Sequence, residues 1–197
     1  WEQYIKHQIC NPKIKVVSFD IFDTLILRPF YYPTDLFFIL EHEFIKLFKT
    51  KAYYNFAQIR IDEEARAREV FKINNTICEE ITLDDIYNQI AEDYGFDREL
   101  LEQLKQKELE LEYKFCYVRK YGKELFELAK QQGKTVVIAS DMYLPKEFIE
   151  KLLAKNGYKY DKLYLSSDIK VGKYSSNMFK YMINDLKVKP NEIMHIG

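Results

Sequence analysis

The sequence predicts an α/β fold in which helices cover both faces of a parallel sheet and an all-helical segment interrupts the chain. Three observations support this prediction. β-rich runs occur at residues 14–19, 134–139, 163–165 and 193–196. Segments of helical periodicity separate the last three runs, and alternating strands and helices are typical of parallel sheets. Between about Arg28 and Arg119 the strand pattern disappears, so we expect only helices there.

The first strand is expected at residues 14–19, where apolar and β-branched residues precede Asp20. A short apolar run that ends in polar residues is typical of a buried parallel strand that leads into a loop. The run at 134–139 repeats this pattern, and the runs at 163–165 and 193–196 are shorter versions of it. Each of these runs predicts one strand of the sheet.

Helices are expected between the last three strands and before the second. Apolar residues recur at helical spacing over residues 121–132, over the segment that begins at Pro145, and over residues 177–186. Gly133 is expected to end the first helix, because glycine readily adopts the left-handed conformation that closes helices. Pro145 suits the first turn of the second helix, and the Asn-Gly pair at 156–157 ends it.

The middle of the chain is predicted to be a four-helix insertion. Apolar residues at helical spacing predict a helix at residues 35–49. Residues 60–69 carry opposite charges at helical spacing, so we expect a solvated helix face with ion pairs. Thr82 begins a capping box, and Asp97 caps a long helix. The predicted domains are an α/β core and the insertion, at residues 1–27 with 120–197 and at residues 28–119.

Charge and cysteine content exclude several classes of function. Thirty Lys and Arg against 31 Asp and Glu give a formal net charge of -1, without the basic excess typical of nucleic-acid binding. No apolar run approaches the roughly 20 residues that cross a bilayer. Three widely spaced cysteines fit neither a disulfide framework nor a zinc site. We expect a cytoplasmic protein that binds neither nucleic acid nor membranes, and the sequence predicts no oligomeric state.

Polar residues follow the predicted strands at the places where a parallel sheet binds ligands. Asp20 and Asp23 follow the first strand, Ser140 and Asp141 follow the second, and Lys173 lies in a Gly-Lys loop beyond the third. Because the carboxyl ends of parallel strands meet at one sheet edge, we expect these side chains to converge. Taken alone, an Asp-x-x-Asp pair is also compatible with a polar loop that caps a helix. The convergence of Ser140, Asp141 and Lys173 on the same sheet edge favours a site.

These motifs resemble those of the haloacid dehalogenase superfamily of phosphatases, phosphomutases and dehalogenases. Residues 16–25, VVSFDIFDTL, are similar to the family's first motif, a hydrophobic strand followed by Asp-x-Asp-x-Thr. Ser140 matches the second motif and Lys173 the lysine of the third, while residues 194–197 look like the strand before the acidic fourth motif. The resemblance covers the whole chain. It implies a Rossmann-like core and identifies the insertion as the family's helical cap.

The resemblance implies a Mg²⁺-dependent phosphatase or phosphotransferase that acts on a small phosphorylated metabolite. Asp20 would be the nucleophile and form an aspartyl phosphate, since its carboxylate is already ionised at neutral pH. Ser140 and Lys173 would stabilise the phosphoryl oxygens. Asp20 and the main-chain carbonyl of Phe22 would supply oxygen ligands to Mg²⁺. Further metal-binding Asp residues are expected after Gly197, since we expect the sequence to be part of a longer protein.

The expected substrate-binding residues are Thr24, Arg28 and Asp141. Thr24 matches the threonine of the first motif, and the Arg28 guanidinium is expected to reach a second anionic group of the substrate. Asp141 is expected either to orient Lys173 or to begin the helix at Pro145. The variant first motif also looks like domains found beside glycosyltransferases in bacterial polysaccharide clusters, which makes a sugar phosphate the first substrate class. His195 is expected to be a packed or hydrogen-bonded core residue.

Phe22 departs from the family pattern and leaves alternatives open. In the family's phosphatases an Asp at this position protonates the leaving group and then activates water, which Phe22 cannot do. Asp23, where the family usually has glycine, is expected either to replace this acid/base or to brace the loop. One alternative function is a metal-independent hydrolase similar to the haloacid dehalogenases, since a halide leaves without a proton. The other is a catalytically weakened binding or interaction domain of a larger polysaccharide-biosynthesis protein.

Overall fold

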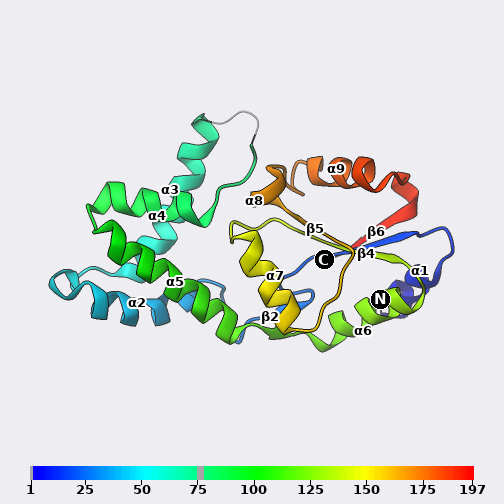
Figure 1. Cartoon of the computed structure of the whole chain (residues 1–197), viewed down its shortest axis with the longest axis horizontal. Coiled ribbons are helices and arrows are strands. Elements are labelled where there is room, and N and C mark those ends of the chain that lie inside the picture. The colour runs from blue at the N-terminus through cyan, green and yellow to red at the C-terminus, as the bar shows by residue number, and fades with distance from the viewer. Residues whose placement is uncertain (1, 75–77) are drawn as a thin grey trace.

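The computed structural model describes residues 2–74 and 78–197. Its centre is a four-stranded sheet with the order β5-β4-β1-β6, in which neighbouring strands are parallel (Figure 1). The strands are β1 (Val16–Phe19), β4 (Thr135–Ser140), β5 (Lys162–Leu165) and β6 (Ile193–Ile196). The predicted α/β fold with a parallel sheet is therefore confirmed. Each predicted strand is present, and the first begins at Val16 rather than at residue 14.

The register of the sheet aligns the carboxyl ends of its central strands. Phe19 at the end of β1 lies opposite Ile138 of β4 and Ile196 of β6. The next amide, that of Asp20, donates a hydrogen bond of 2.9 Å to the carbonyl oxygen of Ile196. Asp20, the end of β4 and the end of β6 therefore lie at one edge of the sheet, where open α/β sheets bind ligands.

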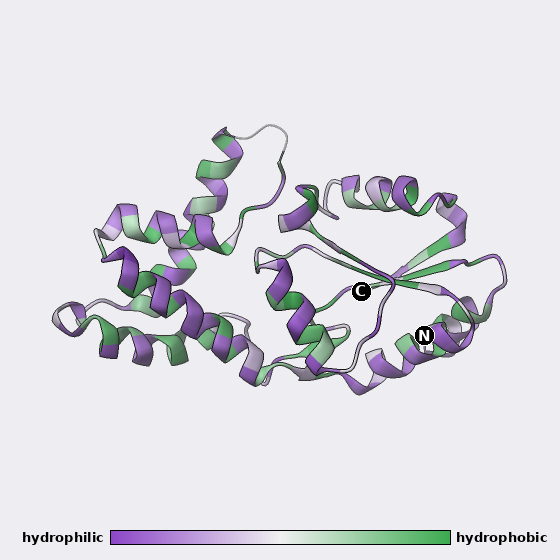
Figure 2. Cartoon of the chain, in the orientation of Figure 1, coloured by the Kyte–Doolittle hydropathy of each residue, from purple (hydrophilic) through white to green (hydrophobic). Residues whose placement is uncertain are grey.

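Helices cover both faces of this sheet (Figure 1). One face packs Val17 and Phe19 into the main hydrophobic core. The helices that contribute to this core include α1 (Glu2–Cys10), α6 (Lys120–Gln131) and α7 (Lys146–Lys155). The other face packs Val16 and Val137 against α9 (Asn177–Leu186). Because successive strand residues point to opposite faces, a strand covered on both sides is mostly apolar. Figure 2 shows hydrophobic residues along β1 and β4, and Ser18 of β1 is the buried polar exception in that strand.

The insertion lies between the short strands β2 (Ile26–Leu27) and β3 (Tyr117–Val118). Among the described residues its α-helices are α2 (Asp35–Leu47), α3 (Phe56–Asn74), α4 (Leu83–Tyr94) and α5 (Arg98–Phe115), with a 3-10 helix at Lys49–Lys51. The predicted caps are present. Thr82 accepts a 3.2 Å hydrogen bond from the Asp85 amide, and Asp97 accepts one of 2.9 Å from the Glu99 amide.

The expectation that residues 60–69 form a solvated helix face is wrong for two of the charged residues in this stretch. Arg60 and Glu63 are buried, and the carboxylate that pairs with Arg60 belongs to Glu108 on α5. The charge pattern within one helix predicts only local ion pairs, such as the one between Arg60 and Glu64. A partner 48 residues away in the sequence cannot be read from that pattern.

An antiparallel pair of two-residue strands, β2 and β3, joins the insertion to the core and was not predicted. Ile26 lies opposite Val118, and Leu27 lies opposite Tyr117. Strands of this length are too short to show the period-2 pattern by which a strand is recognised. The pair holds the two connections of the insertion side by side, while the domain boundaries at residues 28 and 119 stay a prediction.

The first turn of α6 packs directly on the loop that follows β1. A Cβ at Gly122 would lie 2.0 Å from the carbonyl oxygen of Thr24, so only glycine fits there. The Arg119 amide also donates a 2.8 Å hydrogen bond to the Leu25 carbonyl. The chain that leaves the insertion therefore supports the loop that begins with Asp20. None of the helices in the described ranges combines the length and apolar character needed to span a membrane.

Candidate active site

The carboxylate of Asp20 is the centre of a polar cluster at the carboxyl edge of the sheet. Its Oδ1 accepts hydrogen bonds of 2.7 Å from Ser140 Oγ and 2.8 Å from the Ile21 amide. Its Oδ2 lies 2.7 Å from Lys173 Nζ, and the two side chains are 25% and 18% exposed. The carboxylate is thus held by a hydroxyl, an amide and an ammonium group, and solvent still reaches it.

Ser140 and Asp141 are placed by the end of β4. Ser140 is the last residue of this strand and is buried, so its hydroxyl has a fixed position under Asp20. The carboxylate of Asp141 accepts the main-chain amide of Lys173, with distances of 2.8 Å to Oδ1 and 3.0 Å to Oδ2. Of the two roles expected for Asp141, this contact supports the orientation of Lys173. The helix at Pro145 begins without a side-chain cap.

Asp23 lies in the same loop, but its contacts are those of its main chain. Its backbone is left-handed, with φ of 59°. Its amide donates 2.8 Å to the Ile26 carbonyl, and its carbonyl accepts 2.7 Å from Arg119 Nη1. The side chain is exposed, and no hydrogen bond or ion pair of its carboxylate occurs within residues 2–74 and 78–197. Aspartate is one of the few residues that tolerate this conformation, which supports the loop-bracing alternative.

Phe22, Thr24 and Arg28 complete the residues predicted from the first motif. Phe22 is partly buried, and the Arg28 guanidinium lies 3.8 Å above the centre of its ring. Arg28 forms a bidentate pair with Glu112 of α5, with distances of 2.9 Å for Nε to Oε2 and 3.0 Å for Nη2 to Oε1. Thr24 is buried. The structure therefore brings Asp20, Ser140, Asp141 and Lys173 together, whereas it directs Arg28 toward the insertion and gives no contact of Thr24 with the cluster.

His195 borders the cluster, which the sequence did not predict. Its Nδ1 lies 3.0 Å from Ser18 Oγ, as expected of a hydrogen-bonded core residue. A Cβ at Gly197 would lie 3.1 Å from both His195 Nε2 and Asp20 Cβ, so the ring lies close to the candidate nucleophile. Burial, together with the charge of Lys173, lowers the pKa of His195 to about 4. The imidazole is therefore neutral at neutral pH.

Two oxygen atoms of the loop after β1 suit a magnesium ion. The carboxylate of Asp20 is one, and the other is the main-chain carbonyl of Phe22, which accepts no hydrogen bond from any described residue. Mg²⁺ prefers oxygen ligands and keeps several waters, so two protein ligands fit part of its coordination shell. Over the described ranges, no group of three or more His, Cys, Asp or Glu side chains is arranged to hold a metal ion.

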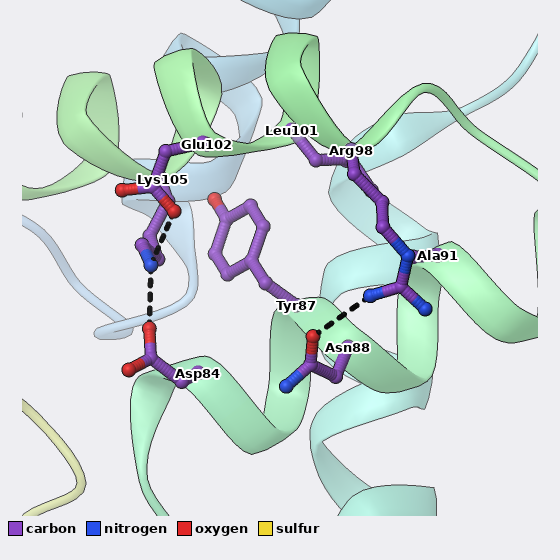
Figure 3. A pocket seen from close by; sticks show the side chains of 8 residues that line it. All are labelled: Asp84, Tyr87, Asn88, Ala91, Arg98, Leu101, Glu102 and Lys105. Atoms are coloured by element: carbon purple, nitrogen blue, oxygen red, sulfur yellow. Dashed lines mark hydrogen bonds and ion pairs between the residues drawn. The ribbon is translucent and has the colours of Figure 1, made fainter.

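A separate pocket of about 340 Å³ lies between α4 and α5 in the insertion (Figure 3). Its charged side chains are paired with their neighbours. Lys105 Nζ lies 2.5 Å from Asp84 and 2.6 Å from Glu102, and Arg98 donates 3.1 Å to the side-chain oxygen of Asn88. None of the predicted site residues lines this pocket. Its polar groups are thus largely satisfied by one another, and the predicted site residues lie elsewhere, in the Asp20 cluster.

Comparisons with solved structures agree with this fold. A protein described as a predicted phosphoglycolate phosphatase from Haemophilus somnus 129PT has a TM-score of 0.56 and 12% identity, covering 94% of this chain and 77% of its own. A β-phosphoglucomutase candidate from Thermotoga maritima has a TM-score of 0.59 and 13% identity, covering 92% and 75%. A 2-haloacid dehalogenase from Pseudomonas syringae pv. tomato DC3000 has a TM-score of 0.61 and 14% identity, covering 92% and 76%. At these identities the likeness shows the fold.

The family itself follows from the sequence comparison. No curated protein matches this chain. The model of one protein family does match it, over residues 14–197, which includes the first strand, the insertion and the loop of Lys173. That span contains every residue of the Asp20 cluster. The chain therefore belongs to the haloacid dehalogenase-like hydrolases.

Proposed function

We propose that this hydrolase cleaves or transfers the phosphoryl group of a small organic phosphate through an aspartyl phosphate on Asp20. The observation that carries the proposal is the environment of one carboxylate. Asp20 lies at the carboxyl end of the central strand, with the Ser140 hydroxyl and the Lys173 ammonium each 2.7 Å from its oxygens. Together they supply a nucleophile and two groups that stabilise the phosphoryl oxygens.

In the proposed reaction a carboxylate oxygen of Asp20 attacks the phosphorus atom. The bond from phosphorus to the leaving oxygen breaks, and its electron pair stays on that oxygen. The oxygen takes up a proton from solvent or from Asp23, since Phe22 has none to give. The phosphoryl oxygens carry negative charge, which the Lys173 ammonium and the Ser140 hydroxyl stabilise in a partly enclosed site. Water or an acceptor hydroxyl then attacks the aspartyl phosphate and regenerates the Asp20 carboxylate. The Asp141 carboxylate keeps Lys173 in place by accepting a hydrogen bond from the main-chain amide of Lys173.

Mg²⁺ is the proposed cofactor, held by the Asp20 carboxylate and the Phe22 carbonyl. When bound, it neutralises negative charge on the phosphoryl oxygens. Helices α2–α5 are the proposed cap, over residues 28–119. Closure of such a cap excludes water and selects the substrate. A sugar phosphate in the cytoplasm is the proposed substrate class. One of the similar structures bears the name of a β-phosphoglucomutase, and another that of a phosphoglycolate phosphatase.

Phe22 favours a second candidate function, a metal-independent hydrolysis like that of a haloacid dehalogenase. Its ring lies under the Arg28 guanidinium and has no group that transfers a proton. In that reaction Asp20 forms a carboxylic ester while a halide leaves with its electron pair and needs no proton. The 2-haloacid dehalogenase named above has a similar fold. A domain that binds a phosphorylated ligand without turnover is the third outcome that Phe22 permits.

The test is phosphate release from a panel of sugar and nucleotide phosphates, with Mg²⁺ and with EDTA. We expect release that requires Mg²⁺ and disappears in Asp20→Asn. Halide release from 2-haloacids in the presence of EDTA would instead establish the second candidate. Absence of turnover in both assays, with a phosphorylated ligand still bound in a calorimetric titration, would contradict both hydrolases.

A further inference from the structure

Residues 79–83, which lead into α4 of the insertion, contact both loops of the candidate site. We propose that Glu79 in this segment is a positioning residue, which fixes the loop that carries Lys173. The inference deepens the proposed function and rests on it for the role of Lys173. The inference rests on four hydrogen bonds of Glu79, three accepted by its carboxylate and one donated by its main-chain amide.

The Glu79 carboxylate binds the Lys173 loop at three points. Oε2 accepts a 2.7 Å hydrogen bond from the Gly172 amide and one of 2.6 Å from Ser175 Oγ. Oε1 accepts a 2.5 Å hydrogen bond from Asn177 Nδ2. The main-chain amide of Glu79 donates 3.0 Å to the Lys170 carbonyl. The residues contacted thus lie on both sides of Lys173 in the sequence.

The backbone of this loop needs such support. Lys170 and Ser176 are both left-handed, with φ of 63° and 64°. Residues other than glycine adopt this conformation at a cost of about 1–3 kcal/mol each and keep it only where the surroundings hold it. The Glu79 contacts lie between or beside these two positions. We infer that loss of the carboxylate lets the loop leave its conformation.

Glu79 and Asp141 hold consecutive amides of the loop from opposite parts of the molecule. Asp141, in the core, accepts the Lys173 amide, and Glu79, in the insertion, accepts the Gly172 amide. A Cβ at Gly172 would lie 3.5 Å from Glu79 Oε2 and 3.6 Å from Asp141 Oδ2, so the two carboxylates flank this glycine. Two anchored amides fix the direction in which the Lys173 side chain leaves the backbone, toward Asp20.

The same segment also binds the loop that follows Ser140. Glu80 is buried and accepts a 3.2 Å hydrogen bond from Ser166 Oγ, which in turn accepts 2.8 Å from the Met142 amide. The Leu83 amide donates 3.0 Å to the Tyr143 carbonyl. The insertion therefore contacts the Ser140 loop and the Lys173 loop through adjacent residues, and Glu79 is the member of the segment that acts on the lysine.

The test compares Glu79→Ala with Glu110→Ala, in which an exposed carboxylate that pairs with Lys107 on α5 is removed. Hydrogen exchange in the peptides covering residues 170–176 is measured first, without substrate. We expect exchange there to be about tenfold faster or more in Glu79→Ala, because the Gly172 amide loses its acceptor, and unchanged in Glu110→Ala. Glu79→Gln keeps one oxygen acceptor and is expected to lie between wild type and Glu79→Ala.

The second readout is kcat for Mg²⁺-dependent phosphate release, in the wild-type and Lys173→Met backgrounds. In the wild-type background we expect Glu79→Ala to lower kcat by about 10–100-fold, since a displacement of the Lys173 side chain by about 1 Å costs that much. In the Lys173→Met background we expect the same substitution to lower kcat by less than about twofold. An equal loss in both backgrounds would mean a general structural role and would overturn the proposal, as would unchanged exchange. If the wild-type protein releases no phosphate, the proposed function fails, and exchange alone decides whether Glu79 fixes the loop.

Discussion

The core and the insertion contain clusters made of the same chemical groups. In the core, the Asp20 carboxylate lies 2.7 Å from both a lysine ammonium and a serine hydroxyl. In the insertion, the Glu108 carboxylate accepts hydrogen bonds of 2.8 Å and 2.9 Å from the Arg60 guanidinium and one of 2.7 Å from the Tyr87 hydroxyl. In each cluster a carboxylate is thus bound by both a cation and a hydroxyl group.

The clusters differ in their access to solvent. The Arg60 and Glu108 side chains are 0% and 1% exposed, against 18% and 25% for Lys173 and Asp20. Arg60 lies over the ring of Phe37 at 4.5 Å and near that of Tyr143 at 5.3 Å. Its cluster joins α3, α4 and α5 through Arg60, Tyr87 and Glu108, and Glu64 of α3 also pairs with Arg60. Composition alone thus does not make a site, because a substrate can reach the partly exposed Asp20 carboxylate but not the enclosed Glu108 carboxylate.

The largest effect is expected from Asp20→Asn. The amide keeps the shape of the side chain but is a far weaker nucleophile, so kcat is expected to fall by at least about 10⁴-fold, or about 5.5 kcal/mol in activation free energy. Because the pair with Lys173 is partly exposed, the free energy of unfolding is expected to change by less than about 1 kcal/mol. Steady-state kinetics and urea unfolding measure the two quantities. Retained turnover would remove Asp20 as the nucleophile.

The matching change in the insertion is Glu108→Gln, and its effect is expected on stability. Removing the Glu108 charge takes away the buried carboxylate partner of Arg60 and leaves the partly exposed Glu64 carboxylate, 3.1 Å from the guanidinium. The expected cost is at most about 3–5 kcal/mol of unfolding free energy. Replacing all three residues by apolar ones, in the triple variant Arg60→Met, Glu108→Leu, Tyr87→Phe, is expected to recover most of this loss. Urea unfolding of both variants is the measurement. A stable Glu108→Gln protein with reduced kcat would contradict the comparison, since the buried cluster would then have a role in turnover.

The core site was predictable because its residues follow strands in the sequence. Asp20, Ser140 and Lys173 each stand just beyond a recognisable strand or in its loop, and the rule that parallel strands end at one edge brings them together. The family resemblance then assigned their roles as expectations. The strand order, with β1 between β4 and β6, was not predicted, because helical periodicity between strands does not say on which side each strand is added.

The buried cluster was not predictable for the opposite reason. Arg60 lies in a run of charged residues that predicts a solvent-exposed helix face, and its partner Glu108 is 48 residues further along the chain. Arg28 was expected at the substrate, yet its partner Glu112 is 84 residues away. Glu79 has no motif at all and acts through the Gly172 amide. Pairings between elements depend on how the helices pack, which single-sequence patterns do not contain.

Glu63 gives a smaller effect that depends on pH. Burial, with a hydrogen bond to Asp93, raises the pKa of Glu63 to about 7 from 4.5. Between these two pKa values the native state holds a proton on Glu63 that the unfolded chain has lost. The stability that this protonated carboxyl contributes is complete below pH 4.5 and is lost as the pH rises to about 7. Glu63→Gln cannot titrate at this position, whereas wild type loses stability as Glu63 ionises. The unfolding free energy of Glu63→Gln minus that of wild type is therefore expected to rise from pH 5 to pH 8 by on the order of 1–3 kcal/mol.

The difference between Glu63→Gln and wild type isolates this residue from His195. The lowered pKa of His195, about 4 against 6.5, acts in the opposite direction, since the unfolded chain then binds the extra proton and stability falls as pH decreases through this range. Because His195 is present in both proteins, its contribution cancels in the difference. A difference that stays constant from pH 5 to pH 8 would show that Glu63 is ionised in the native protein.

The smallest effect on kcat is expected from Asp23→Gly, which tests whether the Asp23 carboxylate reacts or only the backbone of this residue supports the loop. Asp23→Gly removes the carboxylate and suits the left-handed backbone, with φ of 59°, whereas Asp23→Ala removes the same carboxylate and does not suit it. If Asp23 braces the loop, as its main-chain contacts support, Asp23→Gly is expected to keep kcat within about threefold of wild type, and Asp23→Ala to lower it further. If Asp23 is the acid/base that Phe22 cannot be, both variants are expected to lose about 10²-fold or more alike. The ratio of the two variants' kcat values therefore separates the roles, because only a backbone role distinguishes glycine from alanine.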